Sequence, residues 1–206
     1  MNTLFTIGHS NHEIGTLVEL MRRHGVQAVA DVRSQPYSGR FPQFNQPVLK
    51  LALRASGMRY VFLGQELGAR REEACCYVEG QARYDLVAKT DAFAEGLERV
   101  LKGLKKHRIA LLCAERDPLT CHRAILVCRH LRGKGFPIKH ILADGSLESH
   151  EAAEQRLLGM QGKTQPSLFA THDQLMEQAY DEQGYKIAFR QTNWVSEEEL
   201  QPTGRT

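Results

Sequence analysis

Short apolar runs alternate with amphipathic stretches along the first 145 residues of the chain. The apolar runs predict five strands, at residues 4–7, 28–32, 60–63, 109–113 and 138–142. Stretches with apolar residues three or four positions apart predict helices, between Ile14 and a stop signal at Gly25 and at residues 46–56, 91–107, 121–132 and 148–158. Such alternation is typical of a mostly parallel sheet that helices cover on both faces. We therefore predict an α/β fold, a Rossmann-like three-layer sandwich with about five strands.

Residues 64–84 interrupt this alternation, because they are polar and rich in Gly and Arg. A connection of this length often carries function. After about residue 147, the last predicted helix leads through a linker with Gly and Gln, residues 159–165, into a polar acidic segment. We predict that residues 1–147 form an α/β domain with the functional site. Residues 148–206 are predicted to be a helix and an acidic extension rather than a second domain.

Charge is distributed unevenly along the chain. The 206 residues carry a net charge of +3 and are 42% hydrophobic, which excludes collagen-like and wholly disordered proteins. Residues 1–150 hold 22 basic and 15 acidic side chains, whereas residues 151–206 hold 5 and 9. A basic body favours an anionic partner, either a small molecule or a nucleic acid. The alternative is that this charge only keeps the protein in solution.

The sequence also bears on the compartment. No apolar run approaches the roughly 18–20 residues that span a bilayer, and the start shows no signal-peptide pattern. The five cysteines are odd in number, and two of them are adjacent, so reduced thiols fit better than a disulfide framework. We expect a cytoplasmic protein without a membrane partner, and the sequence predicts no oligomeric state.

Polar residues follow the first two predicted strands. His9 and Ser10 come after the first, and Asp31, Arg33 and Ser34 end the second. Ligand sites in parallel sheets lie beyond the carboxyl ends of the strands, so these side chains are expected at one site. His9 is a candidate acid or base, and Ser10, Arg33 and Ser34 are candidate ligand contacts. Asp31 could orient His9 or pair with Arg123, although a surface Asp31–Arg33 ion pair is an alternative of little energetic weight.

Residues 113–123 carry the densest group of reactive side chains. Cys113 and Glu115 end the fourth strand, and Thr120 is a plausible N-cap for a helix whose first turn holds Cys121, His122 and Arg123. Free N–H groups there, with Arg123, favour an anion. We predict Glu115 and His122 as catalytic groups and Cys113 as a ligand contact. Cys121 is predicted to be a nucleophile with a lowered pKa, although it could also be a small half-buried residue.

Other chemistries receive less support. Cys113, Cys121, His122 and His9 would be a sensible metal set, but their spacing is not a paired Cys-x-x-Cys knuckle, so we predict no metal or other cofactor. The glycine motifs of dinucleotide and P-loop sites are absent, as is Gly-x-Ser-x-Gly. The aromatic loop at residues 37–44 could stack on a planar group such as a nucleobase, or could be pinned into the core by Phe41 and Phe44.

The polar groups together resemble the domain-of-unknown-function 488 family. The resemblance is carried by residues 6–10, 31–34 with Pro36 and Ser38, Leu63-Gly64 with Leu67-Gly68, 113–115 and 121–123. It spans about residues 4–145 and extends toward residues 165–169. The chain departs at Ala69, where the family pattern often has a glycine. The resemblance implies an α/β fold and a shared site at the strand ends, but it implies no reaction.

We therefore expect a pocket at the strand ends for a phosphate-bearing ligand, nucleotide-like or nucleic acid, with hydrolase or transferase chemistry. A second hypothesis is a non-catalytic nucleic-acid-binding module in which the acidic segment, residues 173–199, competes in cis. A third is a thiol or metal site built on Cys113 and Cys121.

Overall fold

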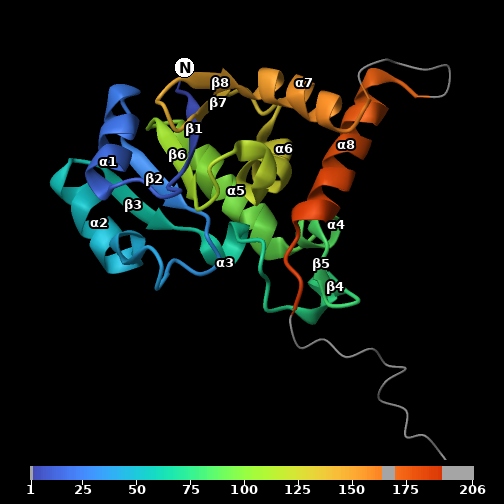
Figure 1. Cartoon of the computed structure of the whole chain (residues 1–206), viewed down its shortest axis with the longest axis horizontal. Coiled ribbons are helices and arrows are strands. Elements are labelled where there is room, and N and C mark those ends of the chain that lie inside the picture. Colours follow the sequence, from blue (N-terminus) through green and yellow to red (C-terminus); the bar gives the residue numbers. More distant parts are fainter. Residues whose placement is uncertain (1, 164–169, 192–206) are drawn as a thin grey trace, which may run out of the picture.

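A computed structural model describes residues 2–163 and 170–191, and it contains one six-stranded sheet (Figure 1). The strand order is β3-β2-β6-β1-β7-β8. Their bounds are Leu4–Gly8 (β1), Ala28–Asp31 (β2), Arg59–Phe62 (β3), Ile109–Cys113 (β6), Ile138–Ile141 (β7) and Leu147–Ser149 (β8). The first five strands in this order run parallel, and β8 runs antiparallel to β7. The α/β prediction is confirmed, with one strand more than expected.

The additional strand, β8, lies where the sequence suggested the start of a helix. Ser149 ends β8, and its hydroxyl accepts a hydrogen bond from the N–H of Ala152 at 3.1 Å. This cap fixes the start of α7 (His150–Met160). The three residues before it are therefore free to pair with β7.

Helices cover both faces of the sheet because its strands alternate their apolar side chains between two cores. On one face, α1 (Ile14–Arg23) and α2 (Gln46–Ala55) pack with Phe5, Ile7 and Leu112. The other face is covered by α5 (Asp91–Leu104), α6 (Arg129–Leu131), α7 and α8 (His172–Ile187). Their contacts include Leu4, Ile109 and Leu111. In the described part of the chain, no helix is long and apolar enough to cross a membrane.

Residues 64–84, predicted as a long connection, contain short elements of their own. These are α3 (Gly64–Leu67), the 3₁₀ turn η2 (Ala74–Cys76), the hairpin of β4 (Tyr77–Val78) and β5 (Gln81–Ala82), and the start of α4 (Tyr84–Val87). Backbone hydrogen bonds join the hairpin to the C-terminal segment, from Ala82 to Phe189 and from Gln191 to Gly80. The connection therefore brings residues after α8 toward the sheet edge.

The helix predicted at residues 121–132 is the least regular element. Cys121 is extended, and His122 leads into a π-helix, η4 (Arg123–Cys128), which continues as α6. Thr120 does not act as its cap, because Thr120 belongs to the preceding 3₁₀ turn η3 (Pro118–Thr120), whose cap is Asp117. Short π-helical segments are frequent at functional sites.

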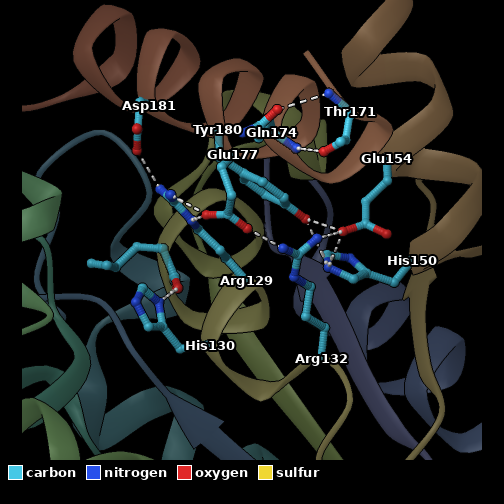
Figure 2. Close-up of polar contacts among 11 residues, drawn as sticks. Arg129, His130, Arg132, His150, Glu154, Thr171, Gln174, Glu177, Tyr180 and Asp181 are labelled. Atoms are coloured by element: carbon cyan, nitrogen blue, oxygen red, sulfur yellow. Dashed lines mark hydrogen bonds and ion pairs between the residues drawn. The ribbon is translucent and has the colours of Figure 1, made fainter. Parts of the chain in front are cut away.

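Acidic side chains of α8 pair with basic side chains of α6 and its C-terminal flank, as Figure 2 shows. Arg129 donates to Glu177 at 3.0 Å and to Asp181 at 2.7 Å. Arg132 donates to Glu154 at 2.8 Å and also pairs with Glu177. These acidic groups are therefore engaged by the body of the protein.

Candidate functional site

A cavity of about 710 Å³ lies beyond the carboxyl ends of β1, β2 and β6. The end of β1 and the segment after β6 approach each other closely at this cavity. A Cβ on Gly8 would lie only 1.7 Å from the Glu115 carbonyl oxygen, so only glycine fits at the end of β1. Seven of the ten predicted site residues line this cavity: His9, Ser10, Arg33, Ser34, Cys113, Glu115 and His122. The other three are Asp31, Cys121 and Arg123, which lie behind the cavity wall and do not line it.

His9 is held in one orientation at the wall. Its ring stacks on Phe44 with 4.3 Å between ring centroids, and its Nδ1 lies 3.0 Å from the Ser10 carbonyl oxygen. A carbonyl can only accept, so Nδ1 donates and Nε2 carries the lone pair. Burial lowers the pKa of His9 to about 4, so the imidazole is neutral at physiological pH. His9 is therefore arranged to accept a proton.

Asp31 positions Arg33 rather than His9 or Arg123. Its carboxylate accepts from Arg33 Nε at 2.8 Å and Nη2 at 2.6 Å, and from the Tyr60 hydroxyl at 2.8 Å. The Asp31–Arg33 pair is present, but it is buried, since Asp31 is 0% exposed and Arg33 6%. Arg33 Nη2 also donates to the Phe44 carbonyl oxygen at 3.0 Å. The pair therefore fixes a guanidinium at the cavity wall.

Cys113, Glu115, Cys121 and His122 form a cluster whose ligand atoms lie within 4.8 Å of one another. The Cys113 thiol lies 3.1 Å from a Glu115 oxygen and 3.6 Å from His122 Nδ1. His122 Nε2 lies 2.9 Å from the Val32 carbonyl oxygen. His9, a member of the metal set considered from the sequence, is not part of this cluster.

The cluster perturbs the pKa values of its members. Desolvation raises the pKa of the buried Cys113 thiol and the pKa of the Glu115 carboxyl, although the Glu115 residue as a whole is exposed. Burial alone would raise the pKa of Cys121 as well, but hydrogen bonding from Cys113 and the charge of Arg123 hold that pKa well below its ordinary value. The lowered pKa agrees with the prediction for Cys121, but the residue is only 1% exposed and does not line the cavity, so its role as a nucleophile stays a prediction.

Arg123 is buried and does not line the cavity, so its role as an anion contact stays a prediction. It is 0% exposed, and Nη1 and Nη2 donate to the carbonyl oxygens of Glu115 at 2.7 Å and Arg116 at 3.2 Å. Its Nε donates to Thr6 at 3.3 Å. The neighbouring N–H groups are also engaged, since Cys121 N donates to Pro118 O and Arg123 N to Cys121 Sγ. Arg123 therefore holds the loop that carries Glu115.

Three cavity arginines were not singled out from the sequence as ligand contacts: Arg40, Arg70 and Arg116. Within residues 2–163 and 170–191, none of them forms an ion pair. Arg70 lies 4.6 Å from the centroid of the Phe189 ring, which also lines the cavity. The aromatic neighbours of Arg40 were its only sequence signal. Phe189 gave none, because α8 had to fold back to bring it here.

In the aromatic loop at residues 37–44, one ring is packed into the core and others line the cavity. Phe44 is fully buried beneath His9, whereas Phe41 is partly buried and lines the cavity. Tyr37 also lines the cavity and is 59% exposed. One end of the loop is therefore anchored, and the other presents aromatic rings to the cavity.

The family comparison covers most of this site. Residues 13–129 match the family described as "Domain of unknown function DUF488". Residues 165–169, toward which the resemblance was extended, lie outside both this match and the described part of the chain. Comparison with curated proteins and with solved structures gave no match.

Proposed function

Since the chain belongs to DUF488, a family whose description assigns no reaction, we propose from the site itself that the protein binds a phosphate-bearing, nucleotide-like small molecule. His9 and Glu115 would exchange protons with this ligand during hydrolysis or group transfer. The observation that carries the proposal is the charge of the cavity lining, which holds four arginines and a single carboxylate.

The arginines differ in how they could serve an anion. Arg33 is fixed by Asp31, whereas Arg40, Arg70 and Arg116 have no carboxylate partner within the described ranges. A planar guanidinium can make two parallel hydrogen bonds to phosphate. A hollow lined by one sign of charge also concentrates the opposite ion. These features favour a ligand with at least one phosphate.

The size of the cavity favours a small molecule over a polymer. Its volume of about 710 Å³ is in the range of small-ligand pockets. Tyr37 and Phe41 line the same cavity as Arg40 and offer rings on which a nucleobase can stack. Two of the acidic groups of α8 that a competing tail would use, Glu177 and Asp181, are paired with Arg129 and Arg132. These observations favour the small-molecule hypothesis over the nucleic-acid module.

Two groups of the lining could move protons. The pKa of about 4 leaves His9 unprotonated, so its free Nε2 can accept a proton from water or a hydroxyl, although the same shift makes it a weaker base than an ordinary histidine. Burial raises the pKa of Glu115, so this carboxyl is easier to hold in its acid form. The pair would supply a base and an acid from neighbouring strand ends.

Isothermal titration with inorganic phosphate, AMP, ADP, ATP and a short single-stranded oligonucleotide tests the proposal. We expect the nucleotides to bind more tightly than phosphate. Replacing Arg70 or Arg116 by Ala should weaken nucleotide binding by about tenfold, roughly 1.4 kcal/mol. Arg54→Ala is the matched control, because Arg54 is exposed on α2 and does not line the cavity.

Two results would contradict the proposal. One is that none of the nucleotides binds, or that Arg54→Ala weakens binding as much as Arg70→Ala. The other is that the oligonucleotide binds while the mononucleotides do not, which would favour the nucleic-acid module.

A further inference from the structure

Four side chains of kinds that bind metal ions come together at the cavity wall, where three of them line the cavity and Cys121 lies behind them. Cys113 and Glu115 come from the end of β6, and Cys121 and His122 from the segment that enters η4. The four residues span ten positions of the chain, and their ligand atoms lie within 4.8 Å of one another. The 3₁₀ turn η3 lies between the two pairs and folds the second pair back onto the first.

His122 is oriented as a metal-binding histidine would be. Its Nε2 lies 2.9 Å from the Val32 carbonyl oxygen, so Nε2 donates and Nδ1 is the nitrogen that faces the cluster. Metal-bound histidines commonly donate their second N–H to such a carbonyl, which fixes the tautomer and the ring plane. Val32 directly follows β2, so the sheet itself supplies this support.

The distances in the cluster suit a tetrahedral ion. Zinc bonds of about 2.3 Å to sulfur and about 2.0 Å to nitrogen place the two atoms about 3.5 Å apart at the tetrahedral angle. The Cys113 Sγ to His122 Nδ1 distance is 3.6 Å. The Cys113 Sγ to Glu115 oxygen distance is 3.1 Å, so the exposed Glu115 side chain would retreat by a few tenths of an ångström.

The charge of the surroundings also suits a bound cation. Two thiolates and one carboxylate carry three negative charges, so their complex with a divalent ion carries one. Arg123 lies beside the cluster, and its backbone N–H donates to Cys121 Sγ at 3.4 Å. Its guanidinium is fully buried, and its partners within the described residues are carbonyl oxygens and a hydroxyl. The anionic complex would give this buried cation a counter-charge.

We propose that Cys113, Cys121 and His122 bind one Zn²⁺ ion in the wall of the cavity, with Glu115 as the fourth ligand. Two thiolates and an imidazole prefer zinc over calcium or magnesium. Glu115 is the exposed member and lines the cavity, so it is the ligand that an incoming oxygen could displace. Metal binding itself does not depend on the proposed nucleotide. Only the displacement of Glu115 rests on the proposed function, because Glu115 can carry the proton that the proposed function assigns to it only after it has left the metal.

The experiment measures metal content in the full-length protein, prepared without chelator, by elemental analysis and by cobalt substitution. We expect one zinc per chain. Cobalt should give the visible bands of a tetrahedral ion together with thiolate charge-transfer absorption. Cys121→Ser and His122→Ala should lose the stoichiometric metal. Glu115→Gln should retain metal with roughly tenfold weaker affinity and a changed cobalt spectrum.

Two control variants test whether these losses are specific. Cys75→Ser removes an exposed thiol, and Cys128→Ala removes a buried thiol of η4. Neither residue belongs to the cluster, so both variants should retain the metal. Circular dichroism of each variant separates loss of metal from loss of folding.

A measurement on the unmutated protein keeps the proposal testable if the cysteine variants do not fold. A strong chelator should remove the zinc from the unmutated protein, and added Zn²⁺ or Co²⁺ should restore one metal ion per chain together with the thiolate charge-transfer absorption of the cobalt form. The proposal is overturned if the wild type binds neither zinc nor cobalt, since Cys121 and His122 would then form only a thiolate–imidazolium pair. Equal metal loss in Cys75→Ser and Cys121→Ser would also overturn it. A protein that binds nucleotide but no metal would leave the proposed function in place and reject this site alone.

Discussion

The imidazole of His9 sits in a niche that excludes water on most sides. Only 3% of the residue is exposed, and the Phe44 ring stacks against it. A charged imidazole would lose hydration there, which is why its pKa falls from 6.5 to about 4. His9 can therefore serve as a base in the cavity, and it also makes the folded protein sensitive to acid.

The pH dependence of stability should reveal this histidine. The unfolded chain binds the His9 proton near pH 6.5 and the folded chain near pH 4, so stability falls as the pH drops through this window. The loss is about 1.4 kcal/mol per pH unit. Urea denaturation across the window measures it, and His9→Gln should lose about 3 kcal/mol less than the wild type. His140 and His150 also have lowered pKa values, but they are present in both proteins. Identical acid profiles would contradict the prediction.

Arg33 and Arg123 show how burial separates two residues of the same type. Both are buried cations near the carboxyl ends of strands, but Arg33 faces the cavity while Arg123 donates into the loop behind it. The sequence indicated both as anion contacts, because spacing does not tell which way a guanidinium points. The exposed arginines 40, 70 and 116 complete the lining instead.

At the scale of elements, a chain of buried hydrogen bonds joins the sheet to the last helix. Thr6 on β1 contacts His140 on β7 at 2.8 Å, and His140 contacts His150 on α7 at 3.0 Å. Tyr180 on α8 then lies 3.0 Å from His150 and 2.9 Å from Glu154 (Figure 2). The two histidines gave no sequence signal, since their partners come from segments far apart in the chain.

Tyr180→Phe tests how much this junction contributes to stability. The variant keeps the ring but removes the hydroxyl, which leaves the buried His150 without that partner. We expect the free energy of unfolding to fall by about 1–3 kcal/mol. Tyr185→Phe on the same helix is the control, because Tyr185 is 56% exposed and should change stability little. Chemical denaturation of both variants measures the free energy of unfolding. An equal decrease in the two variants would mean that the Tyr180 hydroxyl contributes no more to stability than an exposed tyrosine hydroxyl does.

At the scale of the whole molecule, the C-terminal helix belongs to the same packed unit as the sheet. Its Met176, Ala179 and Tyr180 join the larger core. Ile187, the last residue of the helix, and Phe189, which follows it, line the cavity. The acidic extension that the sequence suggested as a competitor of nucleic acid therefore contributes a wall to the site. Residues 192–199 of that extension lie outside the described part of the chain.

Truncation after residue 163 should consequently weaken nucleotide binding rather than strengthen it. It uncovers apolar core surface and removes the Phe189 ring beside Arg70. We expect a lower melting temperature and at least about tenfold weaker binding. Phe189→Ala tests the wall without removing the helix, and truncation after residue 191 tests the acidic residues 197–199 separately. Tighter binding by the protein truncated after residue 163 would restore the competing-tail hypothesis.

The sequence by itself determined the layered α/β fold and the edge of the sheet at which the polar residues gather. It could do so because apolar periodicity sets which faces are buried, and parallel strands place their carboxyl ends together. Only the tertiary structure decided which of those residues face the cavity, and that Glu115 rather than His9 joins Cys113, Cys121 and His122. It also decided that Phe189 completes the wall. These outcomes depend on side-chain direction and on contacts between distant segments, and a local pattern encodes neither.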